Sequence, residues 1–211
     1  MEWVMVKSPK DDERGLKKAS ECLLAGGVIV YPTETYYGLG ALALDERAVA
    51  RVFEQKRRSV EKQLTVLIPD IETLGQFVVE LPPLGKMLAE KFWPGPLTII
   101  LRANPDLLKP LKAVTEKVGF RVSSHPVALE LTRLVNGPIT ATSANISGSP
   151  PVVDPRDLPG EFLKGVDLVL DSGKTPGGAA STIVDVTGAV PVILREGPLG
   201  VKVGKVIKLF S

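Results

Sequence analysis

Histidine and cysteine are almost absent from the sequence, which contains one of each, His125 and Cys22. A single cysteine excludes an internal disulfide and a zinc site built from cysteines alone. A mixed zinc site or a Cys/His nucleophile pair would need carboxylates at spacings that the sequence does not supply. Pro126 follows His125 directly, and proline favours the first position of a helix, so we expect His125 to be a helix N-cap rather than a catalytic group. We expect no metal held by protein ligands.

A strong net charge and long apolar runs are also missing. Lys and Arg number 26 against 24 for Asp and Glu, a net charge of +2, which is too small to draw the whole chain to nucleic acid or to a membrane. No run approaches the roughly 18 apolar residues of a membrane span, and the first residues lack the apolar segment of a secretory signal. No linker interrupts the 211 residues. We therefore expect a single domain over residues 1–211, cytoplasmic and without membrane contact.

Three common catalytic motifs fail on their spacing. The GKT run at 173–175 lacks the glycine that a P-loop requires five residues earlier, where Leu168 stands. The letters of residues 38–43, GLGALA, fit a dinucleotide fingerprint, but the next helix is expected to begin near Asp45 and not on the glycines. No serine stands in a G-x-S-x-G elbow. These spacings argue against a P-loop NTPase, a dinucleotide-binding fold and an α/β-hydrolase.

Helical and extended patterns alternate along the chain, which is typical of an α/β or α+β domain. Asp45 is a good N-cap for a helix ending near Lys56, and Pro94 stops another helix. The helix that begins at Pro126 has a predicted apolar stripe of Val127, Leu131, Leu134 and Val135, and we expect it to end at Gly137. Strands are predicted within residues 28–31, 64–69, 97–103, 118–124, 138–145, 166–170, 181–186 and 190–195. At least seven strands and about five helices favour a large twisted sheet with helices against it.

Three pairs of polar residues are spaced two apart: Thr33 with Thr35, Lys56 with Arg58, and Ser143 with Asn145. In extended backbone this spacing puts both side chains on one face. Pro32 favours an extended conformation at the preceding residue, Tyr31. If the ends of several helices and strands bring these cations, hydroxyls and amides together, the groups would form a phosphate-binding site. Taken singly, the pairs are explained as ordinary strand residues, a solvated helix end and a polar loop.

Two arginines stand in apolar surroundings. Arg121 lies between Phe120 and Val122, and Arg195 follows an apolar run. A charge in a strand pattern either faces water or is paired inside a cleft.

Aromatic residues make up only 5% of the sequence, yet all three tyrosines lie within residues 31–37. Tyr36 and Tyr37 can be core rings with solvated hydroxyls, and we assign them no catalytic part.

Six motifs in order along nearly the whole chain resemble the YrdC/TsaC-like threonylcarbamoyl-AMP synthase family. They are PTETYYGLGALA, KRR, WPGPLT, TATSANISG, STIVDV and ILREG. The resemblance implies a YrdC-like twisted mixed sheet with flanking helices around a large concave cleft. It also implies a nucleotidyltransferase that converts ATP, L-threonine and bicarbonate into threonylcarbamoyl-AMP and pyrophosphate, with Mg²⁺ bridging the phosphates. The product would pass to a downstream threonylcarbamoyl-transferase complex acting on tRNA.

The resemblance also implies roles for individual residues. The catalytic, triphosphate-holding set would be Lys56, Arg58, Ser143 and Asn145. Arg195 would contact the nucleotide. Threonine would be bound by Thr33, Thr35, Arg121 and Ser181, with Arg121 taking its carboxylate. Because neither side-chain type usually fills a core, we expect Lys56→Ala and Ser143→Ala to leave the fold intact while activity collapses.

The sequence departs from the family pattern at three positions, where prolines are common and Ser59, Gln63 and Glu196 stand instead. Two other functions remain open. One is an RNA-binding module, for which the run at 56–58 and the basic residues 201–208 would supply the cations, with weak RNA contact. The other is carbamoyl transfer within a larger assembly, with no substrate assigned. A sibling group of the same fold lacks the S-x-N pair, which is present here as Ser143 and Asn145.

Overall fold

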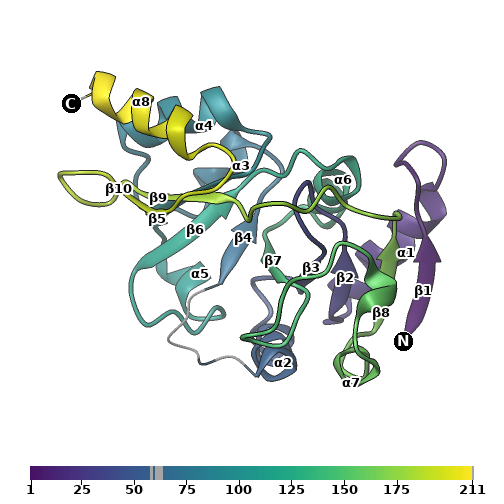
Figure 1. Cartoon of the computed structure of the whole chain (residues 1–211). Coiled ribbons are helices and arrows are strands. Elements are labelled where there is room, and N and C mark those ends of the chain that lie inside the picture. The colour runs from purple at the N-terminus through teal and green to yellow at the C-terminus, as the bar shows by residue number, and fades with distance from the viewer. Residues whose placement is uncertain (58, 60–63, 211) are drawn as a thin grey trace.

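The computed structural model describes residues 1–57, 59 and 64–210. The strands in this part are β1 (Glu2–Met5), β2 (Ile29–Tyr31), β3 (Gly38–Gly40), β4 (Thr65–Leu67), β5 (Leu97–Arg102), β6 (Lys117–Arg121), β7 (Ile139–Ser143), β8 (Leu168–Asp171), β9 (Thr182–Asp185) and β10 (Val192–Arg195). They form one ten-stranded sheet in the order β1-β8-β2-β3-β7-β4-β6-β5-β9-β10 (Figure 1). The sheet contains both parallel pairs, such as β4 with β6, and antiparallel pairs, such as β4 with β7. The predicted mixed sheet is confirmed.

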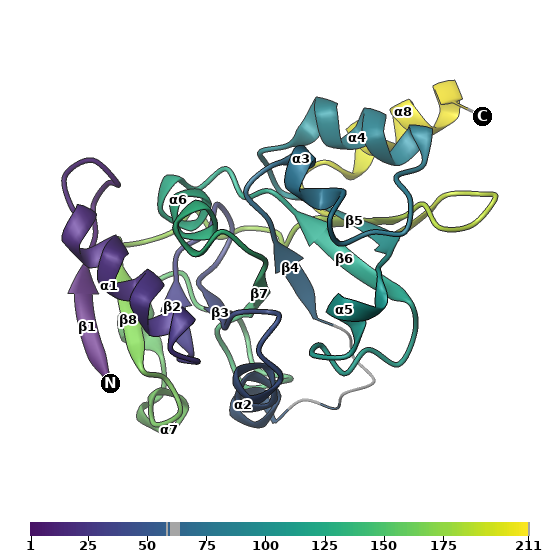
Figure 2. The same cartoon turned by 180° about the vertical axis from the view of Figure 1, so that it is seen from behind.

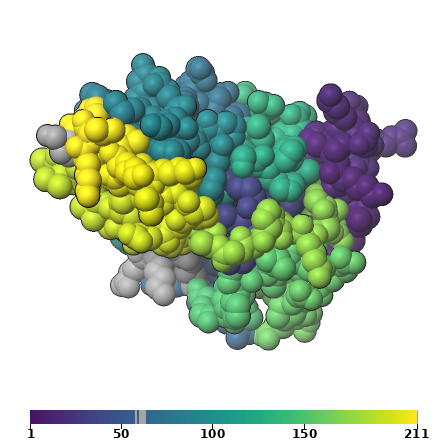
Figure 3. Space-filling model, turned by 45° about the horizontal axis from the view of Figure 1, so that its top comes forward, coloured from purple at the N-terminus to yellow at the C-terminus, as the bar shows by residue number. Residues whose placement is uncertain are grey.

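The helices flank this sheet. They are α1 (Glu13–Leu24), α2 (Glu46–Lys56), α3 (Ile71–Leu74), α4 (Pro83–Phe92), α5 (Pro105–Leu108), α6 (Pro126–Val135), α7 (Gly160–Leu163) and α8 (Gly200–Phe210), with a 3-10 turn, η1, at Pro155–Asp157. Seen from behind, α1 and α6 lie together near one end of the sheet, and α3, α4 and α8 gather near the other (Figure 2). In the space-filling view α8, in yellow, lies against the teal segment that includes α4 (Figure 3).

Alternating side chains divide the core into two clusters, one on each face of the sheet. In β2, Ile29 and Tyr31 join the cluster that contains the buried residues of α1 and α6, whereas Val30 joins the one that contains those of α2, α4 and α8. Successive side chains of a strand point to opposite faces. Because both faces of β2 are covered, its three residues are all buried and apolar or aromatic.

The same alternation brings polar groups to one face of β6. Val118 and Phe120 are buried in the α2/α4/α8 cluster, so Gly119 and Arg121 face the opposite way. A Cβ on Gly119 would lie 2.9 Å from a methyl of Thr98 and 3.1 Å from the hydroxyl of Thr65. On this side, therefore, small and polar side chains of neighbouring strands meet.

Helix ends follow the predicted signals closely. Asp45 caps α2, accepting hydrogen bonds from the backbone N–H groups of Arg47 at 2.9 Å and Ala48 at 3.0 Å. His125 is the N-cap of α6, as predicted, although its side chain makes no capping bond. Two details of the sequence prediction for α6 were wrong. Leu134 is 43% exposed, because it lies at the edge of the apolar stripe, and the left-handed cap is Asn136, with φ 47°.

Several elements lacked a readable pattern in the sequence. Strand β1 is mostly exposed and so shows no alternation. Strand β3 is Gly-Leu-Gly, and glycine is depleted in strands. A Cβ on Gly40 would lie 2.6 Å from the ring of Tyr31 and 3.0 Å from the carbonyl oxygen of Thr140, so close strand approach requires glycine there. The basic segment 201–208 is part of helix α8.

None of the helices in the described ranges is both long enough and apolar enough to cross a bilayer.

Candidate functional site

A cavity of about 240 Å³ opens on the polar face of the sheet. It has room for roughly eight water molecules at about 30 Å³ each, the size of an amino acid. Of the nine residues that the sequence analysis singled out, six line it: Thr33, Thr35, Arg121, Ser143, Ser181 and Arg195. They come from the β2–β3 loop, β6, β7, the start of β9 and β10. Segments far apart in sequence therefore converge on one hollow.

Thr33 and Thr35 meet in a tight turn rather than in the extended segment predicted for them. The Thr33 hydroxyl donates to the carbonyl oxygen of Tyr36 at 2.7 Å and accepts from the backbone N–H of Thr35 at 3.2 Å. The two threonine hydroxyl oxygens are 3.1 Å apart. Since the Thr33 proton is already donated, Thr35 donates to Thr33. The pairing of the two hydroxyls is thus a property of the turn.

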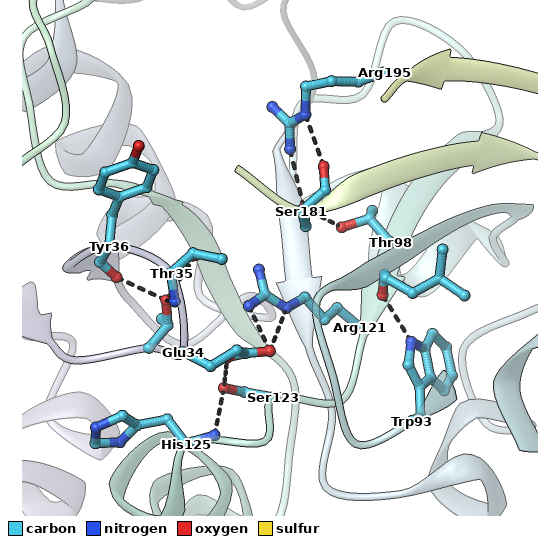
Figure 4. A network of polar contacts seen from close by, with 12 residues as sticks. Glu34, Thr35, Tyr36, Trp93, Thr98, Arg121, Ser123, His125, Ser181 and Arg195 are labelled. Carbon is cyan, nitrogen blue, oxygen red and sulfur yellow. Dashed lines mark hydrogen bonds and ion pairs between the residues drawn. The ribbon is translucent and has the colours of Figure 1, made fainter. Parts of the chain in front are cut away.

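Arg121 is paired inside the site and does not face water. Its Nε donates to Glu34 Oε1 at 3.2 Å, and its Nη2 lies 2.6 Å from the same oxygen (Figure 4). Only 9% of its side chain is exposed, and the buried Nη2 has no partner in hydrogen-bonding geometry. A buried guanidinium with unused donors beside a cavity is suited to a carboxylate or phosphate oxygen.

Glu34 remains ionised in this environment. Burial alone would raise the pKa of its carboxyl group. The charge of Arg121 and hydrogen bonds from Arg121 and Ser123 outweigh burial, so the pKa of Glu34 lies below its usual value.

Ser181 and Arg195 form a second polar group on the opposite side of the cavity from the threonine turn (Figure 4). Arg195 Nη2 donates to the Ser181 hydroxyl at 2.9 Å, and its Nε donates to the Ser181 carbonyl at 2.8 Å. The Ser181 hydroxyl is also 2.9 Å from that of Thr98. Partial burial lowers the pKa of Arg195, and the nearby positive charge of Arg121 lowers it further. Two cations therefore face one space, which favours an anionic ligand there.

Lys56 lies behind the cavity wall and does not line it. It is 2% exposed, and its ammonium donates to the Ser143 carbonyl at 2.5 Å, the Asn145 carbonyl at 2.9 Å and Asn145 Oδ1 at 3.0 Å. The expectation that this lysine would not fill a core is wrong. Its stem is buried as the last residue of α2, and its charge is satisfied by the turn that follows β7.

Asn145 holds the same turn together. Its Oδ1 also accepts from the Ser143 hydroxyl, and its Nδ2 donates to the Ser149 carbonyl, each at 2.5 Å. Lys56, Ser143 and Asn145 therefore form one cluster, with Ser143 on its cavity side. Arg58 and Gln63 lie outside the described residues. Glu196 is exposed.

The three tyrosines within residues 31–37 line the cavity. Tyr31 and Tyr37 are fully buried, and their hydroxyls donate to the carbonyl oxygens of Thr140 at 3.1 Å and Gly173 at 2.6 Å. Tyr36 is less buried and donates to the carbonyl of Gly178. The expected solvated hydroxyls are thus bonded to backbone instead.

Sequence reasoning missed the partners of the predicted residues, namely Glu34, Thr98 and Ser123. An arginine within an apolar strand requires a carboxylate partner, and that was the available signal. The sequence has 24 acidic residues, and spacing alone does not say which one folds against β6.

The described residues contain no cluster of three or more His, Cys, Asp or Glu side chains that could hold a metal. The cavity offers hydroxyls and guanidinium groups instead of a nucleophile with an adjacent base. Such a site can bind and orient anions and neutralise charge during a transfer.

Comparison with known proteins identifies the family. The family model for Sua5/YciO/YrdC, described as telomere recombination, matches residues 21–197. A putative threonylcarbamoyl-AMP synthase of Mycobacterium tuberculosis is 39% identical over 191 residues, covering 90% of this chain and 88% of that protein. The threonylcarbamoyl-AMP synthase of Pyrococcus abyssi is 38% identical over 188 residues, 89% of this chain.

The same fold is found in a solved structure. The crystal structure of P. abyssi Sua5 complexed with L-threonine superposes with a TM-score of 0.90 at 37% identity, covering 98% of this chain and 60% of that one. The chain spans 55% of the matched Pyrococcus protein. The family match and these identities show that the chain belongs to the Sua5/YciO/YrdC family.

Proposed function

We propose that this chain is a threonylcarbamoyl-AMP synthase, which joins L-threonine, bicarbonate and ATP into threonylcarbamoyl-AMP and releases pyrophosphate. The observation that carries the proposal is the buried guanidinium of Arg121, which lines a cavity of about 240 Å³. The relatives named above, one of them crystallised with L-threonine, support the same substrate class.

The reaction suits a site without a protein nucleophile. Bicarbonate gives carbon dioxide and hydroxide, the threonine amine forms an N–C bond to the carbon dioxide, and the proton that the amine loses converts the hydroxide to water. A carbamate oxygen then attacks the α-phosphorus of ATP, and the bond to pyrophosphate breaks. Both steps depend on holding the reactants in line and on neutralising the phosphate charge.

The residues divide between the two substrates. Thr33, Thr35, Arg121 and Ser181 would hold threonine, with its carboxylate on Arg121. Ser143, Arg195 and Arg58 would contact the nucleotide. Lys56 and Asn145 would act on ATP by keeping the 143–149 turn in place. Mg²⁺ would bridge the phosphate oxygens and keep waters as its other ligands, which requires no cluster of carboxylates.

The product is a mixed anhydride, so a second enzyme must transfer its threonylcarbamoyl group before water does. We propose that this acceptor is a threonylcarbamoyl-transferase complex acting on tRNA in the cytoplasm. We further propose that residues 1–211 act as one domain, with at most weak contact to RNA.

The test is incubation of the pure protein with ATP, L-threonine and bicarbonate, followed by pyrophosphate measurement and product mass. We expect pyrophosphate release that requires both threonine and bicarbonate. ATP consumption indifferent to threonine contradicts the proposal. A product that carries carbamoyl without threonine points to carbamoyl transfer, and tight RNA binding with a steep salt dependence points to an RNA-binding module.

A further inference from the structure

The carboxylate of Glu34 lies behind Arg121 as seen from the cavity. Arg121 lines the cavity, whereas Glu34 does not, and only 13% of the Glu34 side chain is exposed. Both close contacts, with Nε and Nη2, involve the single oxygen Oε1. The remaining N–H groups of the guanidinium are therefore left for a ligand that enters from the cavity.

A second anchor fixes the other oxygen of Glu34. The Ser123 hydroxyl donates to Oε2 and accepts from the backbone N–H of His125 at 3.2 Å (Figure 4). Ser123 is 1% exposed, and His125 begins helix α6. The orientation of the carboxylate is thus tied to the start of a helix, and Glu34 has little freedom to follow a moving arginine.

We propose that Glu34, held by Ser123, is a positioning residue for the α-carboxylate of the amino-acid substrate. It holds the Arg121 guanidinium with its unused donors facing the cavity, so the substrate carboxylate meets a preformed two-pronged partner. This inference rests on the proposed function, because it takes that carboxylate as the ligand of Arg121. Glu34 acts through Arg121 and touches no reacting atom.

Two opposite effects decide the sign of a Glu34 substitution. Removing the charge of Glu34 leaves the positive charge of Arg121 uncompensated, which strengthens its attraction for any anion. It also replaces an ion pair by a weaker hydrogen bond from the guanidinium to a neutral oxygen, so the guanidinium loses its fixed orientation. Arg121 is 7% exposed, where water cannot readily replace the lost anchor. We expect the loss of preorganisation to dominate and threonine binding to weaken.

The experiment measures the dissociation constant of L-threonine without ATP by titration calorimetry, and KM for threonine and for ATP by pyrophosphate release. Glu34→Gln keeps an oxygen for Arg121, and we expect about tenfold weaker threonine binding with kcat within about threefold. Ser123→Ala removes only the hydrogen bond to the second oxygen of Glu34, and we expect it to weaken threonine binding about threefold. KM for ATP should stay within about twofold in both variants.

The matched control is Asp185→Asn. Asp185 is a similarly buried carboxylate, 15% exposed, whose ion pair with Lys117 at 2.8 Å lies outside the cavity lining. This variant should bind threonine as the wild type does. Thermal unfolding shows which variants are folded. If Glu34→Gln is unfolded, Ser123→Ala alone tests the proposal.

Three outcomes overturn the positioning role. They are unchanged threonine affinity in the folded variants, tighter affinity, and a rise in KM for ATP equal to that for threonine. A wild-type protein that does not bind threonine overturns the proposed function along with it. Normal wild-type binding that both variants retain overturns the positioning role alone.

Discussion

Lys56 is a buried cation whose ammonium is used to hold backbone. Its three N–H groups match three oxygens of the turn after β7. In addition, the Lys56 carbonyl accepts from the backbone N–H of Ser147 at 2.9 Å. The side chain and the backbone of Lys56 thereby connect the end of α2 to the turn that forms part of the cavity wall.

We expect Lys56→Ala to destabilise the protein by about 2–4 kcal/mol, because buried carbonyl oxygens lose their donors. The measurement is urea unfolding. Lys56→Met keeps the stem and should lose nearly as much, since the hydrogen bonds account for most of the effect. Lys86→Ala is the control: its ion pair with Glu90 is 3.8 Å long and exposed, so its loss should cost less than about 0.5 kcal/mol. Wild-type stability in Lys56→Ala would contradict this assignment.

Because the side chain of Tyr37 is buried, we expect the protein to lose stability at alkaline pH. Burial raises the pKa of Tyr37 to about 12, against about 10 in an unfolded chain. A group whose pKa is raised by folding contributes stability that is complete below the unfolded pKa and is lost as pH rises toward the folded pKa. Tyr37→Phe should be the less stable protein at pH 8, because the Ser172 N–H and Gly173 carbonyl lose a partner.

The gap between the two proteins should therefore narrow as the pH rises from about 10 to about 12. Urea midpoints measured across this range test it. Parallel curves for the wild type and Tyr37→Phe would mean that the phenol ionises equally in both states.

At the scale of elements, the segment after β10 is packed directly on the start of β9. A Cβ on Gly197 would lie 2.3 Å from the carbonyl oxygen of Ala180 and 2.5 Å from the backbone nitrogen of Thr182. The neighbouring Leu199 N–H donates to the Thr182 hydroxyl at 3.0 Å. Glycine thus allows two backbones to approach where Ser181 and Arg195 face the cavity.

We expect Gly197→Ala to separate these segments, with a loss of about 1–3 kcal/mol of stability from the forced shift. Activity should fall more than tenfold, because Ser181 and Arg195 move apart; steady-state kinetics and urea unfolding are the measurements. Gly160→Ala is the control, since a Cβ there meets nothing within 4 Å. Equal behaviour of the two variants would show that the close approach does not matter.

At the scale of the whole molecule, the cavity depends on the order of strands in the sheet. β6, which carries Arg121, lies between β4 and β5, and β9 follows β5, while β7 brings Ser143 from the other side. The residues that the sequence analysis singled out and that line the cavity extend from Thr33 to Arg195 along the chain. The cavity face is polar because α2, α4 and α8 cover the opposite face of the same strands.

Local signals in the sequence determined the mixed fold, most of the longer helices and five residues of the cavity lining, whereas Ser181 was assigned only from the family resemblance. Caps such as Asp45 and the alternation around Arg121 act within a few residues, and so they are readable without coordinates. The family motifs added which of these polar residues belong together. Strand β3 was not predicted, because its glycines are required by the contact with Tyr31 on the neighbouring strand and not by any local preference.

Only the tertiary structure decided which groups satisfy one another. That Glu34 rather than another acid pairs with Arg121, and that Lys56 binds the turn after β7, depends on contacts across 87 to 89 residues of sequence. A side chain's type states what partner it needs. Which partner it finds is determined by how the strands are ordered and by what burial removes from water.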